Sequence, residues 1–421
     1  FESVNLNAFA SLLRPAPEKN ILAVHALNDE VSDGDFLILP ELIVYKNEIT
    51  QQYFPAPTPR RPNSSGQSGQ VSKVWFSHER GFYDAPFTLI LSTEMTGQGV
   101  EIIYTTDGSR PTATHGNAYN PAFPLLIDRT TVIRAVAAGP GWIDSKAKTH
   151  TYIFLDDVKH QSPAGEAPGP NWPAPGYFNG QRMNYGMDPE VVENPAYAAQ
   201  IIDALESIGT ISLVTDLENL FDPSIGIYVN ADGEGRAWER PCSLELVYPE
   251  TPQGAGFPDL VKVPERDGGY RWDLPADMRD GFQIDAGMRI RGGYSVVGDN
   301  PKHAFRFFFR STYGPAALQY RLFGDEGVST YDHIDLRCSQ NYSWAFNGDP
   351  QDTFVRDVFS RDIQGAAGHP YTRSRYYHLY INGQYWGLFQ SQERSEASFA
   401  QSYMAGAKED FDVVKSKSSA G

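Results

Sequence analysis

Alternating apolar and polar positions dominate the sequence and predict a chain built mostly from β-strands. Short β-favouring runs at residues 1–10, 20–28 and 35–45 are separated by Pro, Asn, Asp and Gly. Alternation returns at residues 101–112 and 130–138, with Asp-Gly and Gly-Pro turns near these runs. The 38 Gly and 30 Pro also favour many turns, so we expect more sheet than helix.

Helical spacing of apolar residues first appears near residue 194. It occurs at residues 194–208, with Pro195 near the start and Gly209 just past the end, as helix boundaries favour. A strand-like run at 210–215 follows, and a further helix is predicted near 352–365. The last 220 or so residues therefore read as an α+β domain.

Two segments rich in Pro, Gly and Ser divide the chain. Residues 54–70 and 156–188 have compositions that cannot form a core, so we predict linkers there. The domains that remain are 1–53, 71–155 and 189–421. The first holds only about three strands, too few to bury both faces of a sandwich, and it resembles the last strands of a jelly-roll domain that begins before this sequence.

Charge and cysteine content exclude several classes of protein. With 35 Lys+Arg and 52 Asp+Glu the net charge is −17, which disfavours binding to nucleic acids and to anionic membranes. No apolar run reaches the roughly 20 residues that span a bilayer. Cys242 and Cys338 could form one disulfide or stay as free thiols, and two cysteines exclude a disulfide framework. The nine His form no metal-binding motif, so we expect no metal site.

A glycine-rich turn between two strands at residues 286–310 is the main candidate for chemistry. Glycines let backbone N–H groups approach an anion, and a lysine on the next strand can add charge, as a phosphate site requires. Five basic residues against one acid, Asp299, give residues 286–320 a local charge of +4; the basic residues are Arg289, Arg291, Lys302, Arg306 and Arg310. The alternative is a hairpin whose Arg and Lys side chains point to solvent.

The segment Tyr-Thr-Thr-Asp-Gly-Ser-Arg-Pro-Thr at 104–112 is followed by the strand Thr-Val-Ile-Arg-Ala-Val-Ala and a Gly-Trp turn. This combination resembles the small β-sandwich at the C-terminus of chitobiases and hexosaminidases. The resemblance implies an accessory module without catalytic groups. Asp107 fits that reading, because an aspartate in such a turn bonds to neighbouring backbone N–H groups.

Four further segments follow in order. They are Arg-Ile-Arg-Gly-Gly-Tyr-Ser at 289–295, Pro-Lys-His-Ala-Phe-Arg at 301–306, Phe-Val-Arg-Asp-Val-Phe at 354–359 and the hairpin sequence at 376–393, whose Asn-Gly pair favours a type I′ turn. Together they resemble the CotH family, the spore-coat type of atypical secreted protein kinase, over roughly 200–421.

The CotH resemblance implies a kinase-like N-terminal lobe that binds ATP with Mg²⁺. Lys302 would be the catalytic lysine that contacts phosphate, and Glu393 would lie at the edge leading to the hinge beside the adenine. The remaining residues implied to hold the cofactor are Arg291, Gly292, Gly293, Ser295 and Arg306.

The function implied is phosphorylation of Ser/Thr in surface or matrix proteins outside the cell. Phosphoryl transfer needs acids for the acceptor hydroxyl and the metal, which in this family lie after the hinge, in a second lobe expected beyond Gly421. We therefore expect the fragment alone to be inactive. Turn, cap or exposed-helix roles are predicted for Asp332, Asp335, Asp349, Asp352, Asp357 and Asp362. The alternative is a non-catalytic cell-surface adhesive or scaffold protein, with neighbouring proteins or glycans as partners.

Overall fold

The computed structural model describes residues 52–54, 66–95, 97, 99–250, 261–264, 270–340, 343 and 351–414. Contacts divide the chain into two units, Phe1–Gln51 and Gln52–Gly421, and all described helices and strands belong to the second. The jelly-roll strands predicted at 1–53 and most of the linker predicted at 54–70 lie outside the described residues. No described helix has the length and hydrophobicity needed to cross a bilayer.

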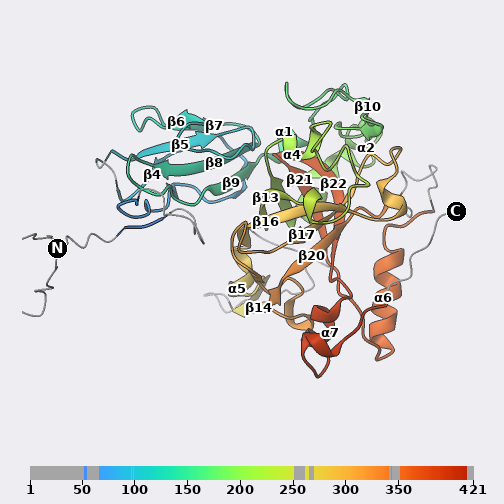
Figure 1. The fold of residues 1–421 in the computed structure, drawn as a ribbon. Coiled ribbons are helices and arrows are strands. Elements are labelled where there is room, and N and C mark those ends of the chain that lie inside the picture. Colours follow the sequence, from blue (N-terminus) through green and yellow to red (C-terminus); the bar gives the residue numbers. More distant parts are fainter. Residues whose placement is uncertain are drawn as a thin grey trace, which may run out of the picture. The chain divides into compact units, whose positions relative to one another are not determined.

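The first part of this unit is a small β-sandwich, as the alternating pattern predicts (Figure 1). One sheet has five strands in the order β2-β9-β8-β5-β6, and the pairs β1-β4 and β3-β7 form two further sheets. The strands are β1 Trp75–Phe76, β2 Gly81–Phe82, β3 Phe87–Leu89, β4 Leu91–Ser92, β5 Glu101–Thr105, β6 Asn117–Ala118, β7 Leu125–Ile127, β8 Thr131–Ala138 and β9 Lys148–Ile153. Val74, Leu89, Ile133 and Tyr152 are buried in its core.

Residues 156–188, predicted as a linker, contain ordered structure. They include most of α1 (Leu155–Val158) and the hairpin of β10 (Gly176–Phe178) and β11 (Gln181–Met183). Met183 and Tyr185 are buried in the core of the domain that follows. A Pro- and Gly-rich composition therefore does not prevent this segment from packing, because a few apolar side chains anchor it.

The second part is a closed barrel of seven strands in the order β12-β13-β16-β17-β20-β22-β21 (Figure 1). Neighbours are antiparallel except β12 and β21, which pair in parallel and close the barrel. The strands are β12 Thr210–Val214, β13 Arg240–Val247, β16 Phe282–Arg291, β17 Ala304–Phe308, β20 His333–Arg337, β21 Tyr376–Ile381 and β22 Gln384–Gln392. The strands predicted to form a kinase-like N-terminal lobe thus belong to a closed barrel, and the likeness to a kinase lobe stays a prediction.

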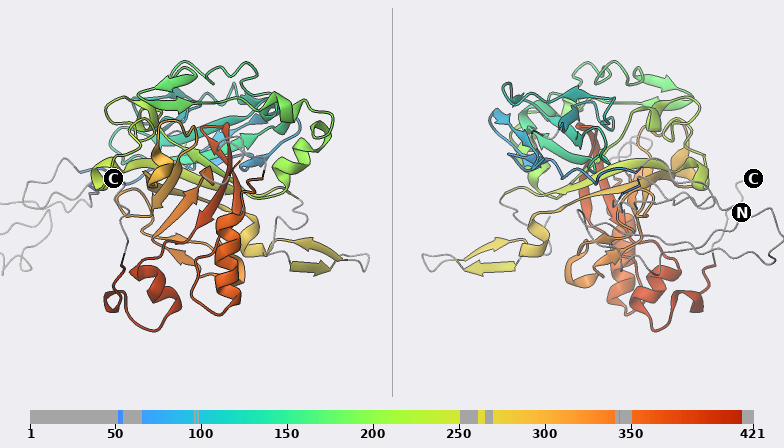
Figure 2. Two further views of the ribbon diagram at one scale, coloured as in Figure 1. Left: turned by 90° about the vertical axis from the view of Figure 1, so that its right-hand side faces the viewer. Right: turned by 60° about the vertical axis from the view of Figure 1, so that its left-hand side comes forward.

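Shorter elements surround the barrel. Figure 2 shows the hairpin of β14 and β15 projecting from it. The other elements are α2 Pro189–Val192, η2 Ala198–Gln200, α3 Ile201–Glu206, α4 Glu218–Phe221, η3 Arg236–Trp238, β14 Val261–Pro264, β15 Tyr270–Asp273, α5 Ala276–Arg279, η5 Tyr294–Val296, β18 Leu318–Gln319, η6 Gly324–Glu326, β19 Thr330–Tyr331, α6 Arg356–Ala366, α7 Ala397–Tyr403 and η8 Lys408–Asp410.

Several local predictions are confirmed. The helices predicted near 194–208 and 352–365 correspond to η2 with α3 and to α6. Asn382 and Gly383 join β21 to β22 with φ of +47° and +84°, as a type I′ turn requires. Asp107 accepts a hydrogen bond from the Ser109 N–H at 2.9 Å, the turn contact expected for this residue.

Strand alternation gives the barrel a filled apolar interior and a polar outside. Phe305, Phe307, Leu336 and Leu379 are buried inside it. The residues between them point outward, and part of that outer surface contacts the sandwich. There the Thr151 hydroxyl of β9 lies 2.7 Å from the Ser212 hydroxyl of β12. The sandwich and the barrel are therefore joined through buried polar contacts.

Candidate functional site

The outer surface of β16, β17 and β20 carries a concentrated set of charges. Because Ile290, Phe305 and Leu336 point into the barrel, the alternate residues of these strands point outward. Pairing then places Arg289 opposite Arg306, and Arg306 opposite Asp335. We call this surface the arginine face; it consists of Arg289, Arg291, Arg306, Arg310 and Arg337 with the acids Glu239, Asp335 and Asp357.

Asp335 is the centre of the arginine face. Its carboxylate accepts two hydrogen bonds from Arg306, from Nε at 2.6 Å and from Nη2 at 2.9 Å. Arg291 Nε lies 3.0 Å from the same carboxylate. Burial alone would raise the pKa of Asp335, but the hydrogen bonds from Arg306 and the charge of Arg291 outweigh it and hold the pKa below its ordinary value. Asp335 is therefore a fixed negative charge between two guanidinium groups.

Glu239 forms a second centre. Its carboxylate lies 3.0 Å from Arg310 Nε and 3.7 Å from Arg289 Nε, and its side chain has no exposed surface. Four of the five basic residues of the predicted basic segment are thus paired with two buried acids. The alternative in which these arginines simply point to solvent is wrong for them.

Helix α6 adds an ion pair between a strand and a helix. Asp357, in its first turn, pairs with Arg337 of β20. The same carboxylate accepts hydrogen bonds from Arg361 Nη2 at 2.6 Å and from Gln390 Nε2 at 3.1 Å. These contacts fix α6 against β20 and β22 and orient the Arg337 guanidinium.

The glycine turn between β16 and β17 is exposed on one side and held on the other. Gly292, at φ +141°, and Gly293 are exposed. The β10–β11 hairpin lies behind the turn, where the Arg182 N–H donates to the Gly298 carbonyl at 2.8 Å and the Tyr177 hydroxyl donates to Asp299 at 2.6 Å. The turn is therefore pre-organised by a segment that precedes it by more than 100 residues.

Another predicted cofactor residue, Ser295, lies in the same turn. Ser295 lies beside Gly292, so that a Cβ on this glycine would meet the Ser295 hydroxyl. The Ser295 carbonyl accepts from Asn300 Nδ2 at 2.8 Å, which closes the turn internally. Arg291, Gly292, Gly293 and Ser295 thus lie together at the end of β16, whereas Arg306 lies in the middle of β17, opposite Arg289.

Lys302 lies away from the arginine face. Its amino group donates to the Asn184 carbonyl at 2.8 Å and sits 3.9 Å from the ring centroid of Trp386, a residue of the barrel core. Burial lowers the pKa of Lys302 to about 7, and no carboxylate among the described residues forms an ion pair with it. The catalytic role predicted for Lys302 stays a prediction; in the structure its amino group contacts a backbone carbonyl and an aromatic ring.

Glu393 follows β22, at the edge predicted to border the adenine. It is 4% exposed. Its carboxylate accepts from the Arg373 N–H at 2.9 Å and from Arg373 Nη1 at 3.1 Å, and it bonds the Tyr403 hydroxyl of α7. All these partners belong to the protein, so the described contacts give Glu393 an anchoring role.

The structure corrects the reading of the acids in this region. Asp335 is not a turn, cap or exposed-helix residue, because it lies in β20 and is 2% exposed. Asp357 is in a helix as expected but is tied to Arg337, whereas Asp362 is an exposed helix residue. Asp349 lies outside the described residues. Among the residues with described positions, no group of three His, Cys, Asp or Glu could hold a metal ion.

Cys242 and Cys338 are both free and buried, which decides between the two states left open by the sequence. Burial raises the pKa of both thiols. Neither is therefore suited to act as a nucleophile.

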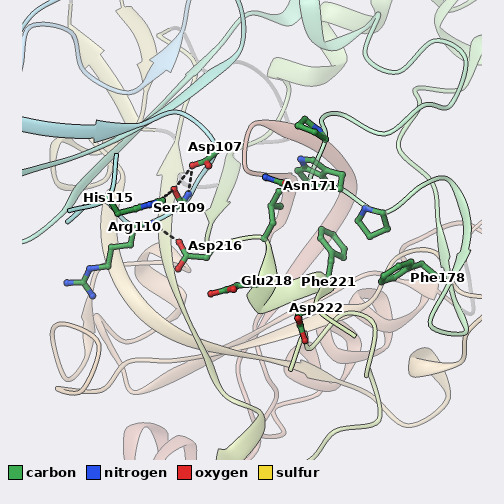
Figure 3. Close-up of a pocket in the computed structure, with 14 residues that line it drawn as sticks. Asp107, Ser109, Arg110, His115, Asn171, Phe178, Asp216, Glu218, Phe221 and Asp222 are labelled. Atoms are coloured by element: carbon green, nitrogen blue, oxygen red, sulfur yellow. Dashed lines mark hydrogen bonds between the residues drawn. The ribbon is translucent and has the colours of Figure 1, made fainter. Parts of the chain in front are cut away.

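A cavity of about 690 Å³ lies where the sandwich meets the barrel domain (Figure 3). Figure 3 shows Asp216, Glu218 and Asp222 following one another along one side, with Asp107 and Asn171 on another. The cavity is lined by Asp107, Ser109, Arg110, His115, Pro170, Asn171, Trp172, Pro173, Phe178, Asp216, Leu217, Glu218, Phe221 and Asp222. These lining residues come from three segments, 107–115, 170–178 and 216–222.

Two protein families match parts of the chain, one in the barrel domain and one in the sandwich. Residues 288–420 match the family described as CotH kinase protein. The matched CotH segment contains the glycine turn, β17, β20, α6 and the β21–β22 hairpin, and thus most of the arginine face. Residues 78–149 match the chitobiase/beta-hexosaminidase C-terminal domain. Both resemblances drawn from the sequence are confirmed, in the order expected. A search of curated proteins finds no match to the chain.

Proposed function

We propose that the chain carries the nucleotide-binding part of a CotH-like kinase, which transfers the γ-phosphoryl group of ATP to Ser or Thr of surface or matrix proteins outside the cell. The observation that carries this proposal is the ion pair between Arg337 of β20 and Asp357 of α6. Protein kinases orient a basic residue of a strand toward phosphates with an acid of the neighbouring helix, and activity requires that pair.

The charge of the arginine face supports binding of phosphates. Its five arginines against three acids leave a net charge of +2, so an anion can still be attracted there. Guanidinium groups bind phosphate oxygens with paired hydrogen bonds. The exposed backbone at Gly292 and Gly293 lies at the end of β16, next to Arg291, and can contribute N–H donors.

ATP would supply the transferable phosphoryl group, and the residues described here would orient its phosphates. Arg337, held by Asp357, and Arg291 and Arg306, held by Asp335, are the residues we assign to that task. No step is assigned to Mg²⁺, because the described residues contain no group of three potential metal ligands.

Calorimetric titration of the chain with ATP in the presence of Mg²⁺ tests the proposal. Arg337→Ala and Asp357→Asn should each weaken binding by about tenfold or more, since each removes a charge-assisted contact worth about 1.4 kcal/mol or more. Arg356→Ala is the matched control, because Arg356 neighbours Asp357 on α6 but pairs with Asp352. Lys302→Met separates the two candidate phosphate-binding residues. If ATP affinity falls in Lys302→Met but not in Arg337→Ala, the phosphates are bound by Lys302 and not by Arg337.

The rival hypothesis is a non-catalytic scaffold or adhesive protein of the cell surface. The buried polar junction between sandwich and barrel favours it, since the two modules are joined as one structural unit. A scaffold needs no nucleotide, so this hypothesis predicts no heat of binding in the same titration.

A further inference from the structure

The cavity at the junction of the sandwich and the barrel domain is built from fixed elements. The Arg110 N–H donates to Asp216 at 2.6 Å, which ties segment 107–115 to segment 216–222. The Asn382 amide donates to the Asp107 carbonyl at 3.2 Å and to the Thr215 carbonyl at 2.8 Å. Its walls are therefore held in place without a ligand, as in most small-molecule sites.

Aromatic rings form one side of the cavity. Trp172 and Phe221 pack with ring centroids 5.3 Å apart, and the Trp172 ring is in turn supported by Tyr185 and Trp386 of the core. Trp172 and Phe178 are only partly buried, so part of each ring is open to a ligand. Such supported aromatic surfaces offer a large contact area at little entropic cost.

Hydrogen-bond donors and acceptors complete the lining of the cavity. Glu218 offers carboxylate acceptors and Asn171 offers an amide with donors and an acceptor. Both residues are exposed, and among the described residues neither side chain forms a hydrogen bond with another residue. Asp222 uses its Oδ1 atom to accept from the Ser224 and Ile225 N–H groups, which fixes the carboxylate at the cavity edge. A ligand rich in hydroxyl groups can satisfy acceptors and donors together.

The charge of the cavity further restricts the class of ligand that it can bind. Four acids, Asp107, Asp216, Glu218 and Asp222, face one arginine, Arg110, which gives −3 with neutral histidine. In Figure 3 the Arg110 guanidinium extends away from the acids. Phosphates, sulfated sugars and uronates would be repelled.

We propose that this junction cavity binds a segment of a neutral oligosaccharide. A pyranose ring has an apolar face that fits Trp172 and Phe178, and its hydroxyls can donate to Glu218 and Asp222 and accept from Asn171. The volume of about 690 Å³ is in the range of small-molecule sites. This inference does not rest on kinase activity, because it involves neither ATP nor the arginine face.

The test is binding of the chain to a printed array of neutral, amino-sugar and acidic oligosaccharides, followed by calorimetry with the strongest neutral probe. Glu218→Gln and Asn171→Ala should each weaken that binding by about tenfold, the effect of one lost hydrogen bond of about 1.4 kcal/mol. Trp172 is not substituted, since it supports the core. Glu234→Gln, an exposed acid outside the cavity, is the control and should leave binding unchanged.

Three results would overturn the proposal. They are no binding to any neutral oligosaccharide at millimolar concentration, binding that neither cavity variant weakens, and preferential binding of spermidine as a cationic probe. A quench of tryptophan fluorescence by the neutral probe that persists in Glu234→Gln and is lost in Glu218→Gln would support it.

Discussion

Replacing Glu245 with glutamine should remove a loss of folding stability that occurs with rising pH at the junction of the sandwich and the barrel. Glu245 lies on β13 and has no exposed surface. Its Oε2 atom accepts from the Thr151 hydroxyl at 2.5 Å, and Oε1 accepts from the Thr151 N–H at 3.3 Å. Burial raises its pKa to about 7, although Arg80, Arg134 and the Thr151 bonds oppose the shift.

The raised pKa of Glu245 determines both the direction and the size of the change in folding stability with pH. Because the folded state holds the Glu245 proton more tightly than the unfolded chain, the stabilisation is complete below about pH 4.5 and is lost as the pH rises through about 7. Each pKa unit corresponds to about 1.4 kcal/mol, so between pH 5 and 8 the loss amounts to about 2.5 kcal/mol. Glutamine keeps the shape but cannot ionise; its Oε1 atom can still accept from the Thr151 N–H, and its Nε2 group can donate to the Thr151 hydroxyl oxygen.

Urea unfolding at several pH values between 5 and 8 measures the difference between wild type and Glu245→Gln. Three buried histidines also titrate, because burial lowers the pKa of His150 to about 3 and those of His303 and His378 to about 4. Their contribution is common to both proteins and cancels in the difference. Glu193→Gln, an exposed acid, should follow the wild type. A constant difference between Glu245→Gln and wild type across this range would refute the reasoning.

Other substitutions should act through specific contacts. Asn382→Ala removes the side-chain bonds to Thr215 and to the sandwich and should lower the unfolding free energy by about 2 kcal/mol in urea, whereas Asn382→Asp should recover part of it. Wild-type stability should rise between pH 7 and 10 as Lys302 loses its proton, since its lowered pKa means that the unfolded chain binds that proton more tightly; Lys302→Met should abolish this rise. Asp335→Asn should destabilise the fold by about 3 kcal/mol, because two partly buried arginines lose their counter-charge, and a thermal melt unchanged from wild type would contradict this.

Much of the fold could be predicted from local sequence patterns. Alternation identified the sandwich strands, and the Asn382-Gly383 pair identified the hairpin turn, because both depend on residues close in sequence. Barrel closure could not be predicted, since the parallel pairing of β12 with β21 joins residues about 170 positions apart. Composition misled at 156–188, where a few buried side chains order a Pro-rich segment.

The candidate site was predicted only in part. The motif led to the glycine turn and to Arg291 and Arg306, but the sequence could not show that Asp335 and Glu239 neutralise the arginines. Arg337 was missed, although the alternation of residues 333–337 places it on the same face as Asp335. Its partner Asp357 comes from a helix 20 positions later, a pairing that tertiary structure alone reveals.

A crystal structure of the chain with a non-hydrolysable ATP analogue and Mg²⁺ would test the central proposal most directly. We expect phosphate oxygens within hydrogen-bonding distance of the Arg337 guanidinium and near the exposed turn at Gly292, with Asp357 still paired to Arg337. An analogue whose phosphates contact Lys302 instead, or crystals that show no nucleotide at saturating concentration, would contradict it.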